Sequence, residues 1–162
     1  MGKSVFVALA LVAFPASAFA GSAITTLSPT DETRVGIGLR FEFGDNAAEV
    51  VGSVRHTHTD TNNFVTGGLA EIAIPVITKK NHGPKIRAMG LAGSTCVQGV
   101  GGIGYDFANQ QPLIGAGVQG PYSEAGANFL FNSELHPYIG LNSYGCAPDK
   151  TTTTTAIILP PG

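Results

Sequence analysis

The stretch TRVGIGLRFEFGD, from Thr33 to Asp45, alternates between apolar and other residues at nearly every position. Residues two apart share a face of a strand, so this pattern predicts a β-strand with one apolar side. The apolar face comprises Val35, Ile37, Leu39, Phe41 and Phe43. The other face comprises Gly36, Gly38, Arg40, Glu42 and Gly44. In a soluble sheet the apolar face fills a core, whereas in a membrane barrel it contacts lipid and the charged residues point inward.

The composition favours the barrel. Charged residues make up 12 % of the 162-residue chain, against about 25 % in ordinary soluble domains. Glycine occurs 22 times and tryptophan is absent. A barrel with lipid outside and a narrow interior needs few charges and many small residues. The net charge of −2 gives no basic footprint, so we expect no nucleic-acid partner.

The first twenty residues have the pattern of a secretory signal peptide. Lys3 supplies the positive start, VFVALALVAF an apolar segment of ten residues, and AFA at 18–20 a cleavage site. Ten apolar residues are too few for a spanning helix, which needs about 20. We therefore expect a signal peptide at 1–20, an extended leader at 21–32, a barrel domain at 33–145 and a low-complexity, threonine-rich tail at 146–162.

The rest of the chain predicts an all-β fold with low helix content. Eight alternating segments are separated by short turn signals, which is typical of a sandwich or a barrel. They lie at 33–45, 49–59, 64–77, from 85 onward, within 97–109, and at 113–122, 124–131 and 137–145. The boundary and register of the fourth and fifth segments stay open. An even number of alternating strands of about ten residues fits an antiparallel up-and-down eight-stranded barrel.

The signal peptide, the eight strands and the ending LHPYIGLNSYG at 135–145 resemble the small outer-membrane β-barrel proteins of Gram-negative bacteria, the OmpA/OmpX-like porin superfamily. That ending resembles the last-strand pattern by which such proteins enter the assembly machinery. The resemblance implies Sec-type export, location in the outer membrane, contact with outer-membrane lipid, and contact with the barrel-assembly machinery during biogenesis. We expect a monomer with a structural, surface-interaction or minor transport role.

The polar faces of the strands are rich in glycine, which leaves room for long side chains inside a narrow barrel. We expect alanine at Gly38 to be tolerated. Buried charges need partners, so we predict an interior charge network. Its expected members are Arg40, Glu42, Glu71, Arg87, Asp106 and Glu124.

The two cysteines, Cys96 and Cys146, are expected to form a disulfide, because export implies an oxidising compartment. With both termini on one side, each cysteine falls at the end of a returning strand. Strands four and eight lie on opposite sides of an eight-stranded ring, so the bridge requires a segment near one cysteine to fold across the mouth.

The sequence predicts no metal site, no cofactor and no enzymatic activity. His56 and His58 share a strand face that Asp60 continues, but no third ligand is evident, and a polar strand end is the preferred interpretation. GVGGIG at 99–104 lacks the helix that a phosphate loop requires. Two alternatives stay open: a secreted or periplasmic β-sandwich that acts as an adhesion or coat module, and a barrel-embedded lipid hydrolase.

Overall fold

The computed structural model of the chain describes residues 22–43, 47–77, 83–131 and 134–157. It has ten strands: β1 (Ser22–Ser28), β2 (Thr30–Glu42), β3 (Ala47–Thr59), β4 (Phe64–Ile77), β5 (Lys85–Ser94), β6 (Gln98–Asp106), β7 (Gln111–Gly120), β8 (Ser123–Leu130), β9 (Leu135–Asn142) and β10 (Thr151–Ile157). No helix in these ranges is long and apolar enough to cross a membrane.

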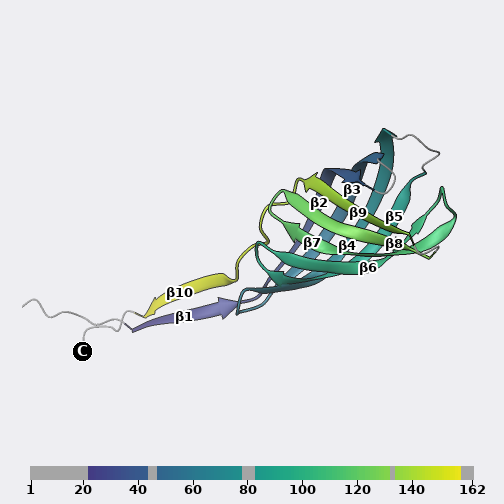
Figure 1. Cartoon of the computed structure of the whole chain (residues 1–162). Coiled ribbons are helices and arrows are strands. Elements are labelled where there is room, and N and C mark those ends of the chain that lie inside the picture. Colours follow the sequence, from purple (N-terminus) through teal and green to yellow (C-terminus); the bar gives the residue numbers. More distant parts are fainter. Residues whose placement is uncertain (1–21, 44–46, 78–82, 132–133, 158–162) are drawn as a thin grey trace, which may run out of the picture. The chain divides into compact units, whose positions relative to one another are not determined.

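Strands β2 to β9 form a closed barrel in sequence order (Figure 1), and each neighbouring pair is antiparallel. The predicted all-β, up-and-down, eight-stranded barrel is therefore confirmed. The two stacked sheets of the sandwich alternative are not the architecture of this chain. The open boundary between the fourth and fifth barrel strands is also settled, because β5 ends at Ser94 and β6 starts at Gln98.

The barrel has two rims, which we name by their connections. The terminal rim is the end where β2 starts and β9 stops, and it carries the short turns at 60–63, 95–97 and 121–122. The far rim carries the other four connections, from β2 to β3, β4 to β5, β6 to β7 and β8 to β9. Strands β2, β3 and β4, with 13, 13 and 14 residues, are the longest of the barrel.

Two strands lie in stretches that we predicted as a leader and a tail. β1 and β10 pair with each other in a separate two-stranded sheet. The threonine run at 151–155 supplies most of β10. Threonine is β-branched and suits an extended strand, so the composition is compatible with this outcome. The first barrel strand also starts earlier than predicted, at Thr30. The predicted signal peptide at 1–20 lies outside the described residues.

Alternation decides which side chains face outward. On β2, Val35, Ile37 and Leu39 are 80 %, 65 % and 60 % exposed, whereas Arg40 and Glu42 are 2 % and 0 % exposed. The polar face therefore points into the barrel, as predicted.

Our expectation that alanine is tolerated at Gly38 is wrong. An added Cβ at Gly38 would lie 2.6 Å from the carbonyl oxygen of Leu141 on the neighbouring strand. Glycine is needed there because the backbone of β9 approaches too closely for a side chain.

Candidate functional site

The inward faces of the strands bring a set of charged and polar side chains together inside the barrel. They sit on inward positions because each lies an even number of residues from another inward residue of its strand. The set comprises Arg40, Glu42, Glu49, Glu71, Lys85, Arg87, Glu124, Asn128 and His136. We call these residues the interior network.

The first part of the interior network centres on Arg40. Its guanidinium donates from Nε to Glu124 at 2.8 Å and from Nη2 to Glu71 at 3.1 Å. Arg87 donates to the same Glu71 carboxylate. The ring of Tyr138 lies 4.5 Å from the Arg40 guanidinium and 4.9 Å from that of Arg87. Each arginine therefore has a hydrogen-bonded carboxylate and an aromatic ring beside it, an arrangement that favours a buried guanidinium.

The second part centres on Lys85, which contacts Glu42 closely and lies 3.1 Å from Oε1 of Glu49. Asn128 joins the two parts, because its Oδ1 accepts from Arg87 at 2.9 Å and its Nδ2 donates to Glu42 at 3.2 Å. The interior network is thus one continuous chain of hydrogen bonds across the barrel.

His136 of β9 extends this chain toward the far rim. Its Nδ1 lies 3.4 Å from Glu42, and its Nε2 lies 3.6 Å from Glu134 in the connection between β8 and β9. His136 is 5 % exposed, so the polar chain reaches the rim through a buried side chain.

The structure places five of the six predicted residues in the interior network, and four of them, Arg40, Glu71, Arg87 and Glu124, form its first part. Glu42 belongs to the second part and pairs with Lys85.

Asp106 is buried but takes another role. Its carboxylate accepts hydrogen bonds from the backbone N–H groups of Ala108 and Asn109 at 2.9 and 3.1 Å. It therefore caps the turn between β6 and β7 and is not joined to Arg40 or Arg87, because at a strand end it reaches the turn more easily than the opposite wall.

Sequence reasoning missed Lys85, Glu49, Asn128 and His136 as members. Lys85 directly follows the polar loop at 78–84. The sequence does not decide which face it occupies, because the register of its strand is ambiguous. The alternation within the segment 49–59 could have identified Glu49, because this residue lies on the face of β3 opposite to Val50 and Val54. The pairing of these groups needs the closed ring, because their strands are far apart in sequence.

The four carboxylates of the network share three strong bases in a buried space, and His136 lies beside one of these carboxylates, Glu42. Each carboxylate accepts from a cation at hydrogen-bond distance. Such an arrangement fixes the shape of the barrel and fills its lumen. Arg40 and Glu71, at the level where the two parts of the network meet, are only 2 % and 7 % exposed.

The terminal rim is closed by the chain that follows β9. This segment, Ser143–Lys150, is called the cap segment here. It contacts the three rim turns in succession: Tyr122 donates its N–H to Tyr144 O at 2.7 Å, Ala147 N–H donates to Thr95 O at 2.7 Å, and Lys150 N–H donates to Asn63 Oδ1 at 3.2 Å. The cap segment therefore crosses the mouth of the barrel from β9 to the turn after β3.

Tyr144 is the part of the cap segment that enters the lumen. It is 2 % exposed, its hydroxyl donates to Ser53 Oγ at 2.9 Å, and its ring lies 4.3 Å from the Arg55 guanidinium. The absence of a side chain at Gly36 makes room for this ring. Tyr144 packs with an apolar cluster whose other buried members are Val65, Leu69, Met89, Leu91 and Ala147.

The predicted disulfide is confirmed. Cys96, in the turn between β5 and β6, bonds to Cys146 of the cap segment, with 4.3 Å between the Cα atoms. The sequence analysis predicted that a segment near one cysteine must fold across the mouth of the barrel, and the cap segment does so. Two cysteines from opposite sides of the ring therefore come together at the terminal rim.

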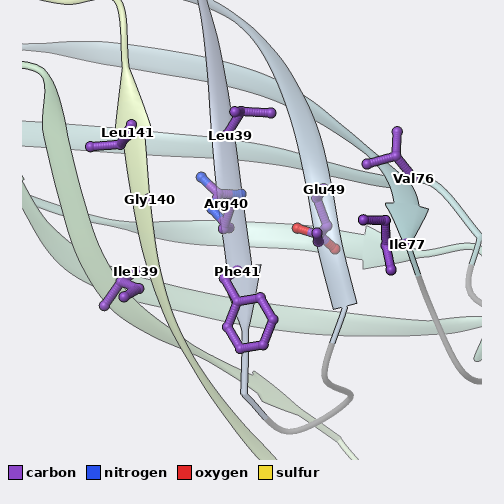
Figure 2. A pocket seen from close by; sticks show the side chains of 10 residues that line it. Leu39, Arg40, Phe41, Glu49, Val76, Ile77, Ile139, Gly140 and Leu141 are labelled. Atoms are coloured by element: carbon purple, nitrogen blue, oxygen red, sulfur yellow. The ribbon is translucent and has the colours of Figure 1, made fainter.

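The outer wall carries an open apolar groove of about 450 Å³. The lining comes from β2, β3, β4 and β9, and it includes the small residues Ala48 and Gly140. Figure 2 shows its large apolar side chains, which are Leu39, Phe41, Val76, Ile77, Ile139 and Leu141. Arg40 and Glu49 lie beneath this groove and belong to the interior network. The groove therefore presents hydrocarbon outward and charge inward across one layer of strands.

His56 and His58 lie on the outer face of β3, near the terminal rim. His56 Nδ1 is 2.8 Å from Thr33 Oγ1, and His58 Nδ1 is 2.7 Å from Asp31 Oδ1. Within the described ranges, no group of three or more His, Cys, Asp or Glu residues is arranged to hold a metal ion. Asp60 accepts from the backbone N–H groups of Asn62 and Phe64 at 2.8 and 2.9 Å. These backbone hydrogen bonds lower the pKa of its carboxyl.

Comparison with known proteins adds no further constraint, since no family model, curated protein or solved structure matches the chain. Its fold and side chains therefore carry the functional argument alone.

Proposed function

We propose that the chain is an integral outer-membrane β-barrel with a filled, charge-paired lumen, which anchors a structural or surface-interaction role in the membrane. The observation that carries this proposal is the inverted distribution of polarity. Large aliphatic side chains such as Ile37 and Leu39 are exposed, while arginine, lysine and glutamate side chains are buried. In water the exposed apolar surface would oppose solubility, and the burial of charge would cost folding free energy. In a bilayer the same arrangement is favourable.

The outward apolar row of β2, which Phe43 continues directly after the strand, is long enough to cross most of an apolar membrane layer. From Val35 to Phe43 it extends about 26 Å along the strand at ~3.3 Å per residue. A strand tilt of ~40° reduces this to about 20 Å along the barrel axis. Membrane barrels have an apolar band of about 25 Å. Below Val35 the outward residues of β2 are Thr33 and Asp31, which mark a polar boundary.

Aromatic side chains gather at the two rims of the apolar band. Near the far rim, Phe41 packs edge-on against Phe43, and Tyr105 packs edge-on against Phe107. Phe131 is also exposed there, at 62 %. At the terminal rim, Phe64 and Tyr122 are 50 % and 63 % exposed. Aromatic girdles at both interfaces are typical of membrane barrels, where such rings sit at the headgroup level.

The closed lumen favours an anchoring role over transport. The interior network fills part of the lumen, and Tyr144 with the cap segment fills it at the terminal rim. We propose that the barrel acts as a monomer in outer-membrane lipid, after export and insertion by the assembly machinery. The other proposal from the sequence, a barrel-embedded lipid hydrolase, is tested by a survey of lipid-hydrolysing activity.

Cell fractionation tests the proposed location. We expect the protein in the outer-membrane fraction, extraction only by detergent, and faster migration of the unheated than of the heated sample on a denaturing gel. Recovery of the folded protein in a soluble fraction without detergent would refute the membrane barrel. Single-channel recording in planar bilayers then tests the closed lumen, and sustained large conductance steps would contradict it.

A further inference from the structure

Two imidazoles on the outer wall are oriented by side chains of the adjacent strand. His56 and His58 are two residues apart on β3, so they share a face and their Cα atoms are about 6.6 Å apart. In the register of β2 and β3, Thr33 is paired with His56 and Asp31 with His58. Both Nδ1 atoms engage these partners, at 2.8 and 2.7 Å. The two rings are therefore held from the β2 side.

These contacts decide which ring nitrogen stays available. An ionised carboxylate only accepts hydrogen bonds, so Asp31 selects the tautomer of His58 that carries its proton on Nδ1. The lone pair is then on Nε2. The Thr33 hydroxyl accepts from Nδ1 of His56 in the same way when that ring takes the same tautomer. A histidine whose Nδ1–H donates to a carboxylate or oxygen while Nε2 faces outward is the arrangement found in metal-binding histidines.

The strand on the other side of β3 leaves space for an ion. The register of β3 and β4 pairs His56 with Gly68 and His58 with Thr66. Gly68 has no side chain, and Thr66 carries only a small hydroxyl-bearing one. The outer wall beside the two rings therefore has room for an ion with its water ligands.

We infer that His56 and His58 form a surface binding site for a divalent transition-metal ion of the copper, nickel or zinc class. The two Nε2 atoms supply two ligands, and water completes the coordination. Imidazole suits these ions, and their affinity at a nitrogen site is highest for Cu²⁺. Asp31 acts as a positioning residue that holds the tautomer of His58. This site is independent of the membrane proposal, because it rests on the β2–β4 surface alone.

Titration of the purified full chain in detergent with Cu²⁺ tests the site. We expect one ion per chain, with an electron paramagnetic resonance spectrum of two nitrogen ligands at pH 7.5. The variant His56→Ala/His58→Ala is expected to lose this binding, and each single variant to weaken it at least tenfold and to leave one nitrogen ligand. His82→Ala is the matched control that removes an imidazole elsewhere in the sequence, and it is expected to bind as the parent does.

The role of Asp31 is tested separately. We expect Asp31→Asn to lower Cu²⁺ affinity about tenfold, the lower end of the 10–100-fold range for outer partners, and to keep the two-nitrogen spectrum. Both histidines are exposed, so circular dichroism should show an intact barrel in every variant. Unchanged Cu²⁺ affinity and spectrum in the double variant would overturn the site.

Discussion

Replacing Arg40 by methionine should destabilise the barrel strongly, because it leaves a buried carboxylate without its cation. Arg40 is 2 % exposed and contacts both Glu71 and Glu124. In the Arg40→Met variant Glu71 still has Arg87 as a partner, whereas Glu124 loses the ion pair that it makes with Arg40. Breaking a buried pair by removing one partner costs about 3–5 kcal/mol. We expect a loss of this size in the free energy of unfolding, measured by urea titration of the detergent-solubilised barrel.

A second substitution tests the stated cause. In the Arg40→Met background, Glu124→Gln removes the stranded charge, so it should recover part of the lost stability, whereas alone it should destabilise. Arg34→Met is the matched control: Arg34 pairs with Glu32 at the terminal rim with its side chain 37 % exposed, and an exposed pair is worth about 0–1 kcal/mol. If Arg40→Met unfolds at the urea concentration of the parent, Arg40 is solvated and the buried network is wrong.

Three further perturbations test the wall, the mouth and the closing seam. Leu39→Arg should block insertion into lipid vesicles, because arginine on the lipid face costs about 2–4 kcal/mol at the bilayer midplane. Thr33→Arg, on the same face but below the apolar row, should insert normally. Equal insertion of the two variants would contradict a lipid-facing row. Thiol labelling of unfolded, unreduced protein should detect no free thiol, and two titratable thiols in the parent would exclude the bridge. The double variant Cys96→Ser/Cys146→Ser should lose up to about 4 kcal/mol of unfolding free energy in the chain-entropy model, given the sequence separation of 50 residues. Gly38→Ala should cost about 1–3 kcal/mol through overpacking against the backbone of β9, and an unchanged urea midpoint would show that this strand can move aside.

The strand count and the inward face of β2 were predictable because alternation is a local property of the sequence. The row around Leu39 and Arg40 carries its own periodicity, and no distant contact is needed to see it. The register of β5 was not predictable in this way. Its outward positions include Ala88 and Gly90, and its inward positions include Met89 and Leu91, so hydrophobicity does not distinguish its two faces. Only pairing with β4 and β6 decides them.

The cap segment and the partners inside the lumen were beyond local reasoning for a different reason. Which carboxylate meets Arg40 depends on how the ring closes, since β2, β4 and β8 come together only across the lumen. The role of Tyr144 depends on the space left by Gly36 on another strand. The disulfide was predictable from compartment and strand parity, but the path that joins Cys96 to Cys146 required the folded mouth.

The seam between β2 and β9 has a consequence for the order of folding events. It is formed by five residue pairs, from Gly38 with Asn142 to Glu42 with Tyr138, whereas β2 and β3 share thirteen. It also joins the first and last strands of the barrel, so its formation carries the largest loop-closure entropy. We therefore expect the pairing of β2 with β9 to form last during folding and to separate first during unfolding. The amide hydrogens of β9 should then exchange fastest. While the two strands are separated, β2 and β9 are edge strands whose unpaired backbone groups can pair with another chain. The cap segment is hydrogen-bonded to Ile37 through Ser143, directly beyond the seam. We therefore expect the disulfide that anchors this segment to shorten the time for which those edges are exposed.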